Sequence, residues 1–163
     1  MVSQKTIDLV KATAPILKER GEEITRKMYQ LMFESRPEYR LWFETTFMTH
    51  VDGGSQPNKL AGSIYAYAIH IDKLDELKKT VEKIANRHVD SQVIAEQYPV
   101  IGDFLLLAMK EVLQEQATPE IMAAWEEAYT ALADIFIQRE KELYQDDDVK
   151  LVASLKSQRF FNH

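Results

Sequence analysis

The chain has 163 residues, 45% of them hydrophobic, which is enough for one domain with its own core. Its formal net charge of −6 argues against a broad nucleic-acid interface, because phosphate binding depends on clustered Lys and Arg. The chain has no cysteine, which excludes disulfides, zinc–thiolate sites, iron–sulfur clusters and thiol catalysis. A bound metal would therefore have to be held by histidine, by carboxylates or by a cofactor.

Neither a leader peptide nor a membrane span is expected. The N-terminal sequence MVSQKTIDLVK lacks the apolar core of a signal peptide. The longest apolar run, FLLLAM at residues 104–109, is far shorter than a bilayer-spanning helix. We therefore expect a soluble cytoplasmic protein.

The first third of the chain has apolar residues at helical spacing. We expect a helix that is capped by Ser3 and ends near Gly21, and a second helix over about residues 22–35. A short third helix begins after Pro37. The segment ETTFMTHVDGGSQPNK, residues 44–59, is predicted to be a loop because glycines and a proline interrupt its periodicity.

The remaining pattern is also helical. Thr118 and Pro119 form a typical helix start, with a capping hydroxyl followed by proline at the first helical position. Only 5 Gly and 5 Pro occur in the whole chain, which favours long helices over the frequent turns of an all-β protein. The predicted fold class is all-α, and four more helices are expected at about residues 58–71, 74–89, 96–113 and 118–144.

The chain changes character after Tyr144. Three consecutive aspartates, Asp146–Asp148, predict a hinge, and the segment VKLVASLKSQRFFNH behind them is mildly amphipathic. We therefore divide the chain into a domain at residues 1–144 and an appendage at residues 145–163. The appendage either docks on its own domain or is partly disordered; alternatively it is a dimerisation or partner-binding helix. Its apolar face would be Val149, Leu151, Val152, Leu155 and Phe160.

His88 occupies a position on a helix where an apolar residue is expected. In the stretch TVEKIANRHV, the apolar stripe runs through Val81, Ile84 and Ala85, and His88 is the next residue on it. A buried imidazole costs free energy unless both ring nitrogens are bonded. A backbone carbonyl could satisfy the ring as part of the core; a metal on one nitrogen and an acceptor on the other would satisfy it equally well.

The type of metal site follows from the neighbours of His88. No second His, Cys or carboxylate lies three or four residues away on the same face, so a zinc site held by the protein alone is not expected. A macrocycle that brings four nitrogens of its own needs only one protein ligand. The metal alternative is therefore haem, bound by a single proximal histidine in an all-α pocket.

Five segments occur in collinear order over about residues 4–144: QKTIDLVKATAPILKERGEEITRKMYQLMF, PEYRLWF, YAYAIHIDKLDELKKTVEKIANRHV, EQYPVIGDFLLLAMKEVL and AWEEAYTALADIFIQREKELY. Together they resemble one known family, the globin domain of bacterial flavohaemoglobins and their single-domain relatives. The resemblance implies a globin fold, a 3-over-3 helical sandwich, with haem b as cofactor.

The resemblance implies a role for three residues on the proximal side of the haem. His88 matches the iron ligand, and Tyr98 and Glu140 match the pair that hydrogen-bonds around its imidazole. A carboxylate that accepts from the second ring nitrogen gives the ligand anionic character, which pushes electron density to iron. The alternative for Glu140 is a solvated glutamate in the charged run REKE.

On the distal side, Tyr29 and Gln56 match the donors that hydrogen-bond a bound ligand, and hydrogen bonds to charged acceptors are the stronger ones. Leu60 matches the apolar residue that crowds the ligand, and Phe43 matches the ring that packs on the haem. Plain core packing is the alternative for Tyr29, Leu60 and Phe43. The loop before Gln56 is a few residues longer than in typical relatives, and its His50 is interpreted as a surface residue.

The resemblance implies a haem globin that binds dioxygen and catalyses nitric oxide dioxygenation. Carbon monoxide would be a further gas ligand, and the protein would be a monomer or a homodimer. No Gly-rich dinucleotide motif is present, so electrons would come from a separate reductase. Three alternatives stay open: an oxygen carrier or store, a haem-based gas sensor that uses the appendage as its output, and a cofactor-free helical interaction domain.

Overall fold

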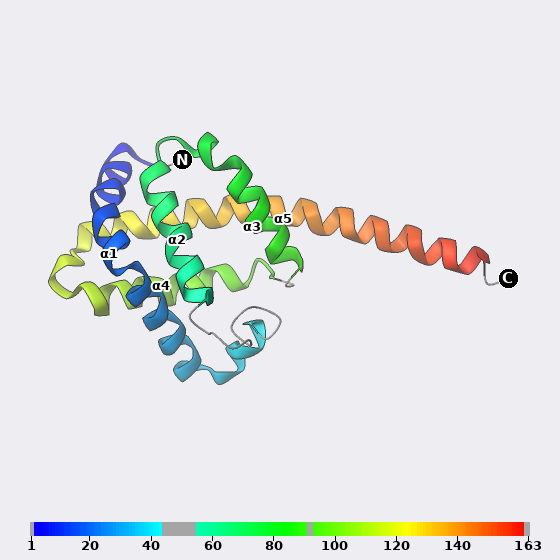
Figure 1. Cartoon of the computed structure of the whole chain (residues 1–163), viewed down its shortest axis with the longest axis horizontal. Helices are drawn as coiled ribbons and strands as arrows, with labels where there is room; N and C mark the ends of the chain where they lie inside the picture. The colour runs from blue at the N-terminus through cyan, green and yellow to red at the C-terminus, as the bar shows by residue number, and fades with distance from the viewer. Residues whose placement is uncertain (1, 44–54, 91–92, 162–163) are drawn as a thin grey trace.

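The structure, a computed structural model, is built from helices. It describes residues 2–43, 55–90 and 93–161, and for residues 41–43, 55–56, 90 and 146–161 it describes the backbone alone. No strand occurs in these ranges, as the predicted all-α class requires. Five long helices are seen: α1 (Gln4–Ser35), α2 (Ser55–His70), α3 (Lys78–Asp90), α4 (Gln97–Leu113) and α5 (Pro119–Phe161) (Figure 1).

Short 3-10 helices connect some of these elements. One spans Pro37–Phe43, as the helix expected after Pro37 requires. Two others span Leu74–Leu77 and Gln114–Gln116, so the helix predicted from Leu74 begins as a 3-10 turn and becomes α-helical at Lys78. Most of the predicted loop, residues 44–54, lies outside the described residues.

Two predicted helix starts are confirmed by their hydrogen bonds. The Ser3 hydroxyl accepts from the backbone N–H of Thr6 at 3.2 Å, and the Thr118 hydroxyl accepts from the N–H of Ile121, also at 3.2 Å. Each cap satisfies one of the amide groups that a helix start leaves without an intrahelical partner. Pro119 occupies the first position of α5, where its missing N–H costs nothing.

The prediction that the first helix ends at Gly21 is wrong. Helix α1 continues through Gly21 to Ser35, and Gly21 is buried where α1 crosses α2. A Cβ atom placed on Gly21 would lie 3.4 Å from the Cβ of Ala61, so glycine allows the two helices to approach closely. The residue serves tertiary packing, which outweighs its weak helix propensity.

The predicted helix end near Tyr144 and the hinge at Asp146–Asp148 are also wrong. Helix α5 continues without a break through the three aspartates to Phe161, and its last part extends away from the other helices in Figure 1. Consecutive positions in an α-helix are about 100° apart, so three successive carboxylates do not have to share one face. No change in secondary structure therefore accompanies the predicted division at residue 144.

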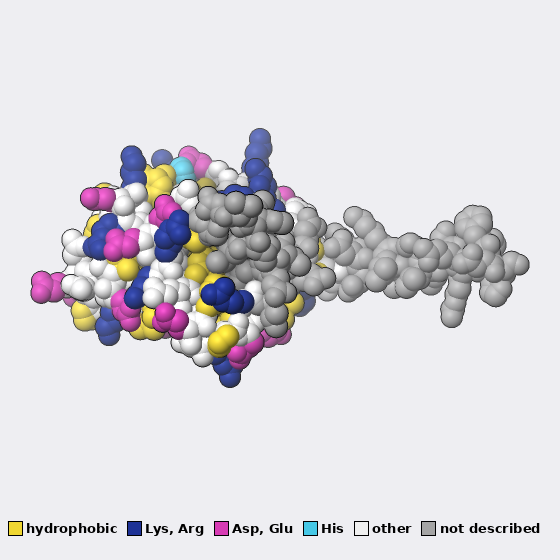
Figure 2. All heavy atoms as spheres, turned by 60° about the horizontal axis from the view of Figure 1, so that its bottom comes forward, with side chains coloured by type: hydrophobic (Ala, Val, Ile, Leu, Met, Phe, Trp, Pro, Cys, Tyr) yellow, Lys and Arg dark blue, Asp and Glu magenta, His cyan; other side chains and the backbone are white. Residues whose placement is uncertain are grey.

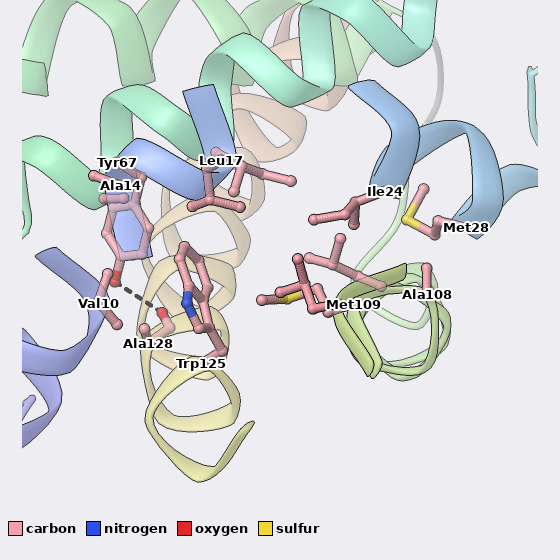
Figure 3. Close-up of a cluster of buried hydrophobic side chains, with 14 of the residues drawn as sticks. Val10, Ala14, Leu17, Ile24, Met28, Tyr67, Ala108, Met109, Trp125 and Ala128 are labelled. Atoms are coloured by element: carbon pink, nitrogen blue, oxygen red, sulfur yellow. Dashed lines mark hydrogen bonds between the residues drawn. The ribbon is translucent and has the colours of Figure 1, made fainter. Parts of the chain in front are cut away.

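The main core lies between α1, α2, α4 and α5 (Figure 3). Trp125 of α5 is 2% exposed, and its indole N–H donates to the Thr13 hydroxyl of α1 at 3.0 Å. The Tyr67 hydroxyl of α2 donates to the Ala128 carbonyl at 2.8 Å, and burial raises the pKa of Tyr67 to about 12. Aromatic residues thus fill the core while their polar atoms remain bonded.

Gly102 of α4 is required by a close contact with α5. A Cβ on Gly102 would lie 2.3 Å from the ring of Tyr129, which is closer than van der Waals contact allows. We predict that Gly102→Ala lowers the free energy of unfolding by about 1–3 kcal/mol, as overpacked cores do. Denaturant unfolding of the variant measures this change.

Gly62→Ala is the matched control for that measurement. Gly62 also lies in a helix, but a Cβ there would have no described atom within 4 Å. Because alanine has the higher helix propensity, we expect this variant to be as stable as the parent or up to ~1 kcal/mol more stable. Equal unfolding curves for Gly102→Ala and the parent would show that α4 and α5 are not as close as described.

The surface shown in Figure 2 has a mixed charge. Lys and Arg side chains are interspersed with Asp and Glu over the described part of that face, without a continuous basic stripe. Such a stripe is the usual footprint of a nucleic-acid interface. Within the described ranges, no helix combines the length and the apolar character needed to cross a membrane.

Candidate functional site

Three of the residues singled out in the sequence meet at one point. His88 near the end of α3, Tyr98 in the first turn of α4 and Glu140 of α5 come from three different helices. The Nδ1 atom of His88 lies 3.0 Å from the Tyr98 hydroxyl and 3.0 Å from Oε2 of Glu140. The Tyr98 hydroxyl lies 2.7 Å from both carboxylate oxygens of Glu140. Each side chain of this cluster thus contacts the other two.

The direction of the hydrogen bonds follows from the available protons. Burial, and secondly the hydrogen bond to Glu140, raise the pKa of Tyr98, so its hydroxyl keeps its proton and donates it to the carboxylate. A carboxylate has only acceptor atoms, so the imidazole donates through a protonated Nδ1. In that tautomer Nε2 carries the lone pair. Nε2 is therefore the ring nitrogen that could bind a metal.

The Glu140 side chain is much more deeply buried than the His88 ring that it contacts. The Glu140 side chain is only 4% exposed, whereas the His88 side chain is 32% exposed. In the described part of the chain, Nε2 of His88 has no hydrogen-bond partner. One nitrogen of the ring is thus held inside the protein, and the other is free to bind a metal.

A small apolar cluster surrounds the polar contacts. The Phe136 ring stacks on Tyr98 with a centroid distance of 6.4 Å and an interplanar angle of 12°, and its centroid lies 5.6 Å from that of His88. Ala85 of α3 and Ala133 of α5 complete this cluster. Because these neighbours exclude water, the bonds to Glu140 are stronger than they would be at the surface.

Tyr129 also holds the site, although it was not singled out in the sequence. Its hydroxyl donates to the backbone carbonyl of Tyr98 at 2.6 Å, and burial raises the pKa of Tyr129. Its position gives a signal that could have been found, since residues 129, 133, 136 and 140 recur at helical spacing on one face of α5. This face of α5 therefore contacts Tyr98 of α4 at several points.

Two of the residues predicted for the distal side, Tyr29 and Leu60, belong to the main core. Tyr29 of α1 is buried, with its ring centroid 5.8 Å from that of Phe33, and Leu60 of α2 is half-buried. The side chains of Phe43 and Gln56 lie outside the described residues. The same is true of the whole of His50. The structure thus brings together the three residues predicted for the proximal side, His88, Tyr98 and Glu140. It places Tyr29 and Leu60 in the separate, larger cluster.

A metal site formed by protein side chains alone is not found in the part of the chain that the structure describes. In the described ranges, no group of three or more His, Asp or Glu residues could hold a metal ion.

The Globin family model matches residues 26–136, which is more than half of the chain. The chain belongs to the globin family. Among curated relatives, a flavohemoprotein of Oceanobacillus iheyensis is 44% identical over 146 residues, covering 90% of this globin and 35% of that protein. This confirms the resemblance to the globin domain of flavohaemoglobins. The chain spans about a third of the length of the curated relatives it matches.

Solved structures agree with this assignment. A bacterial globin from Campylobacter jejuni has a TM-score of 0.79 and 34% identity, covering 88% of this globin and 99% of that chain. An engineered carbene transferase, made from a protein of Rhodothermus marinus that is assigned as a nitric oxide dioxygenase, has a TM-score of 0.80 and 32% identity. It covers 89% of this globin and 97% of that chain. The predicted globin fold is confirmed.

Proposed function

We propose that this globin binds haem b with His88 as the axial ligand of the iron. The observation that carries this proposal is the cluster of His88, Tyr98 and Glu140, which holds Nδ1 and leaves Nε2 available. A core histidine that served packing alone would need no buried carboxylate on its second nitrogen. Residues 1–144 would form the haem-binding domain, to which residues 145–163 are appended.

We further propose nitric oxide dioxygenation as the reaction. Bound haem would supply the iron at which dioxygen and nitric oxide combine to give nitrate, and a separate reductase would return that iron to the ferrous state. The proposal is supported by the flavohemoprotein relatives and by the similar R. marinus protein. We also propose that the protein acts in the cytoplasm.

The protein residues would have distinct tasks in this reaction. Glu140 accepts from Nδ1 of His88, which raises the electron-donating power of the imidazole. Tyr98 shares the carboxylate and keeps it oriented. On the distal side, Tyr29 and Gln56 would donate hydrogen bonds to the gas ligand, and Leu60 and Phe43 would shape the apolar pocket around it.

Turnover with an added reductase tests the reaction. The haem-loaded protein, a flavin reductase and its nicotinamide cofactor are mixed with dioxygen and pulses of nitric oxide, and nitrate is measured. We expect one nitrate for each nitric oxide over many cycles. A protein that binds dioxygen reversibly but forms nitrate only once would be an oxygen carrier or store. A change of oligomeric state on ligand binding would favour a gas sensor.

Removal of the Tyr29 hydroxyl tests the distal assignment. We predict that Tyr29→Phe increases the dioxygen dissociation rate about tenfold, the equivalent of one hydrogen bond to a charged acceptor at ~1.5 kcal/mol. Carbon monoxide is the internal control, because it is a weaker acceptor and should respond less. Stopped-flow displacement measures both rates. An unchanged dioxygen rate would remove Tyr29 from the distal role.

A further inference from the structure

Beside the cluster of His88, Tyr98 and Glu140, an ion pair joins α3 and α5, the two helices that carry His88 and Glu140. Arg139 of α5 donates from Nε to Oε2 of Glu82 at 2.7 Å and from Nη2 to Oε1 at 2.7 Å. Glu82 lies on α3, six residues before His88, and Arg139 is the immediate neighbour of Glu140. Two parallel bonds fix both the separation and the relative orientation of the groups, which one bond does not.

Both partners have further contacts that limit their freedom. The Asn86 amide donates to Oε1 of Glu82 at 3.3 Å, and Arg139 donates from Nη1 to Glu142 at 2.8 Å. The hydrogen bond from Arg139 lowers the pKa of Glu82, and the bond to Glu82 raises the pKa of Arg139. The pair is therefore ionised at neutral pH, and its geometry is held from both sides.

The position of α3 depends on few neighbours. Over the described ranges, the backbone of α3 lies close to α5 and to the 3-10 helix Leu74–Leu77, and its contact with α4 is made through the Tyr98 side chain. The buried residues between α3 and α5 near the site are two alanines, Ala85 and Ala133, and the larger Phe136. Apolar packing of this kind is not directional, so a bidentate polar contact adds a specific limit on how far α3 can shift along α5.

We propose that the Arg139–Glu82 pair sets the register between α3 and α5 that keeps Nδ1 of His88 within hydrogen-bond reach of Glu140. This inference rests on the proposed haem ligation by His88. Arg139 and Glu82 are positioning residues, since they act on the iron through His88 and Glu140. Weakening the pair would loosen the hydrogen bond to Glu140 and reduce the anionic character of the ligand.

The iron–histidine stretching frequency of the ferrous haem protein, measured by resonance Raman spectroscopy, tests the proposal. The variants are Arg139→Gln, Glu82→Gln and Arg139→Lys. The last of these keeps the charge but cannot form the two parallel hydrogen bonds. Glu140→Gln is the positive control for a weakened hydrogen bond from Nδ1 of His88. Lys11→Gln is the negative control, because it breaks an ion pair with Asp72 that involves neither α3 nor α5.

We expect the frequency of Arg139→Gln and Glu82→Gln to fall between those of the parent and Glu140→Gln, with roughly threefold to tenfold faster haem loss, below the range typical of a direct contact. Arg139→Lys should shift in the same direction, because a single ammonium cannot reproduce the two parallel bonds. The variant that carries both Glu82→Gln and Arg139→Gln should shift the iron–histidine frequency no further than either single variant does.

Ionic strength supplies a test that needs no variant. The two side chains are 34% and 46% exposed, so salt screens their attraction. Raising the salt concentration should shift the iron–histidine frequency of the parent toward that of Arg139→Gln. The frequency of Arg139→Gln itself should not change.

An unchanged frequency in Arg139→Gln and Glu82→Gln, together with a lower melting temperature, would reduce the pair to a purely structural role and overturn the proposal. A parent protein that bound no haem would instead overturn the proposed function. The two failures are thus distinguishable, because only the second removes the response of the positive control.

Discussion

His88→Ala is expected to lose the axial ligation of haem. In the proposed site this imidazole is the one protein ligand of the iron, and removing even a residue that orients such a ligand typically costs 10–100-fold in affinity. We therefore expect haem retention to weaken by more than about 100-fold, with loss of the ferrous–carbon monoxide spectrum of a histidine-ligated haem. Added imidazole should restore part of that spectrum by filling the space of the missing ring.

His70→Ala is the matched control for this experiment. His70 at the end of α2 also forms a histidine–glutamate contact, with Nδ1 3.0 Å from Oε2 of Glu76, but that glutamate is largely exposed. The variant should keep the parental spectrum. A normal ferrous–carbon monoxide spectrum in His88→Ala without added imidazole would contradict the assignment of the ligand.

The second large effect is expected for Glu140→Gln. Glutamine has nearly the same shape and still accepts from Tyr98, but its neutral oxygen is a weaker acceptor for Nδ1 than a carboxylate. We expect a lower iron–histidine stretching frequency, about 10–100-fold faster haem loss, and slower nitric oxide turnover. The rate of haem transfer to an excess of apomyoglobin measures the loss.

Glu76→Gln tests whether a buried carboxylate is needed for that effect. It makes the same change in the exposed pair with His70 and should leave haem retention as in the parent. If Glu140→Gln retained haem as well as Glu76→Gln does, the carboxylate would have no part in holding the ligand.

The sequence predicted those parts of the fold that depend on local chemistry. Ser3 and Thr118 are predicted caps that the structure confirms, because a hydroxyl before a helical stretch binds amides of its own first turn. His88 was found as the polar residue on an apolar stripe. Its type and position raised the question of a second partner without supplying one.

The features that the sequence did not predict depend on contacts between distant segments. Gly21 reads as a helix end until Ala61 of α2 is placed against it. Glu140 alone is typical of a charged surface run, and only the family resemblance predicted its place beside His88, which is 52 positions away in the chain. Arg139 and Glu82 are also far apart in the chain, and each residue alone is typical of an exposed helix face, so the sequence did not predict their two hydrogen bonds.

The central claim, that this globin binds haem through His88, is tested most directly by the visible absorption spectrum of the purified protein. The spectrum is recorded as isolated, after reduction with dithionite, and after addition of carbon monoxide. We predict a Soret band that moves with each step as expected for a haem with one axial histidine. A protein that is colourless, and remains so after haem is added, would contradict the account and leave His88 as a buried ring in a helical interaction domain.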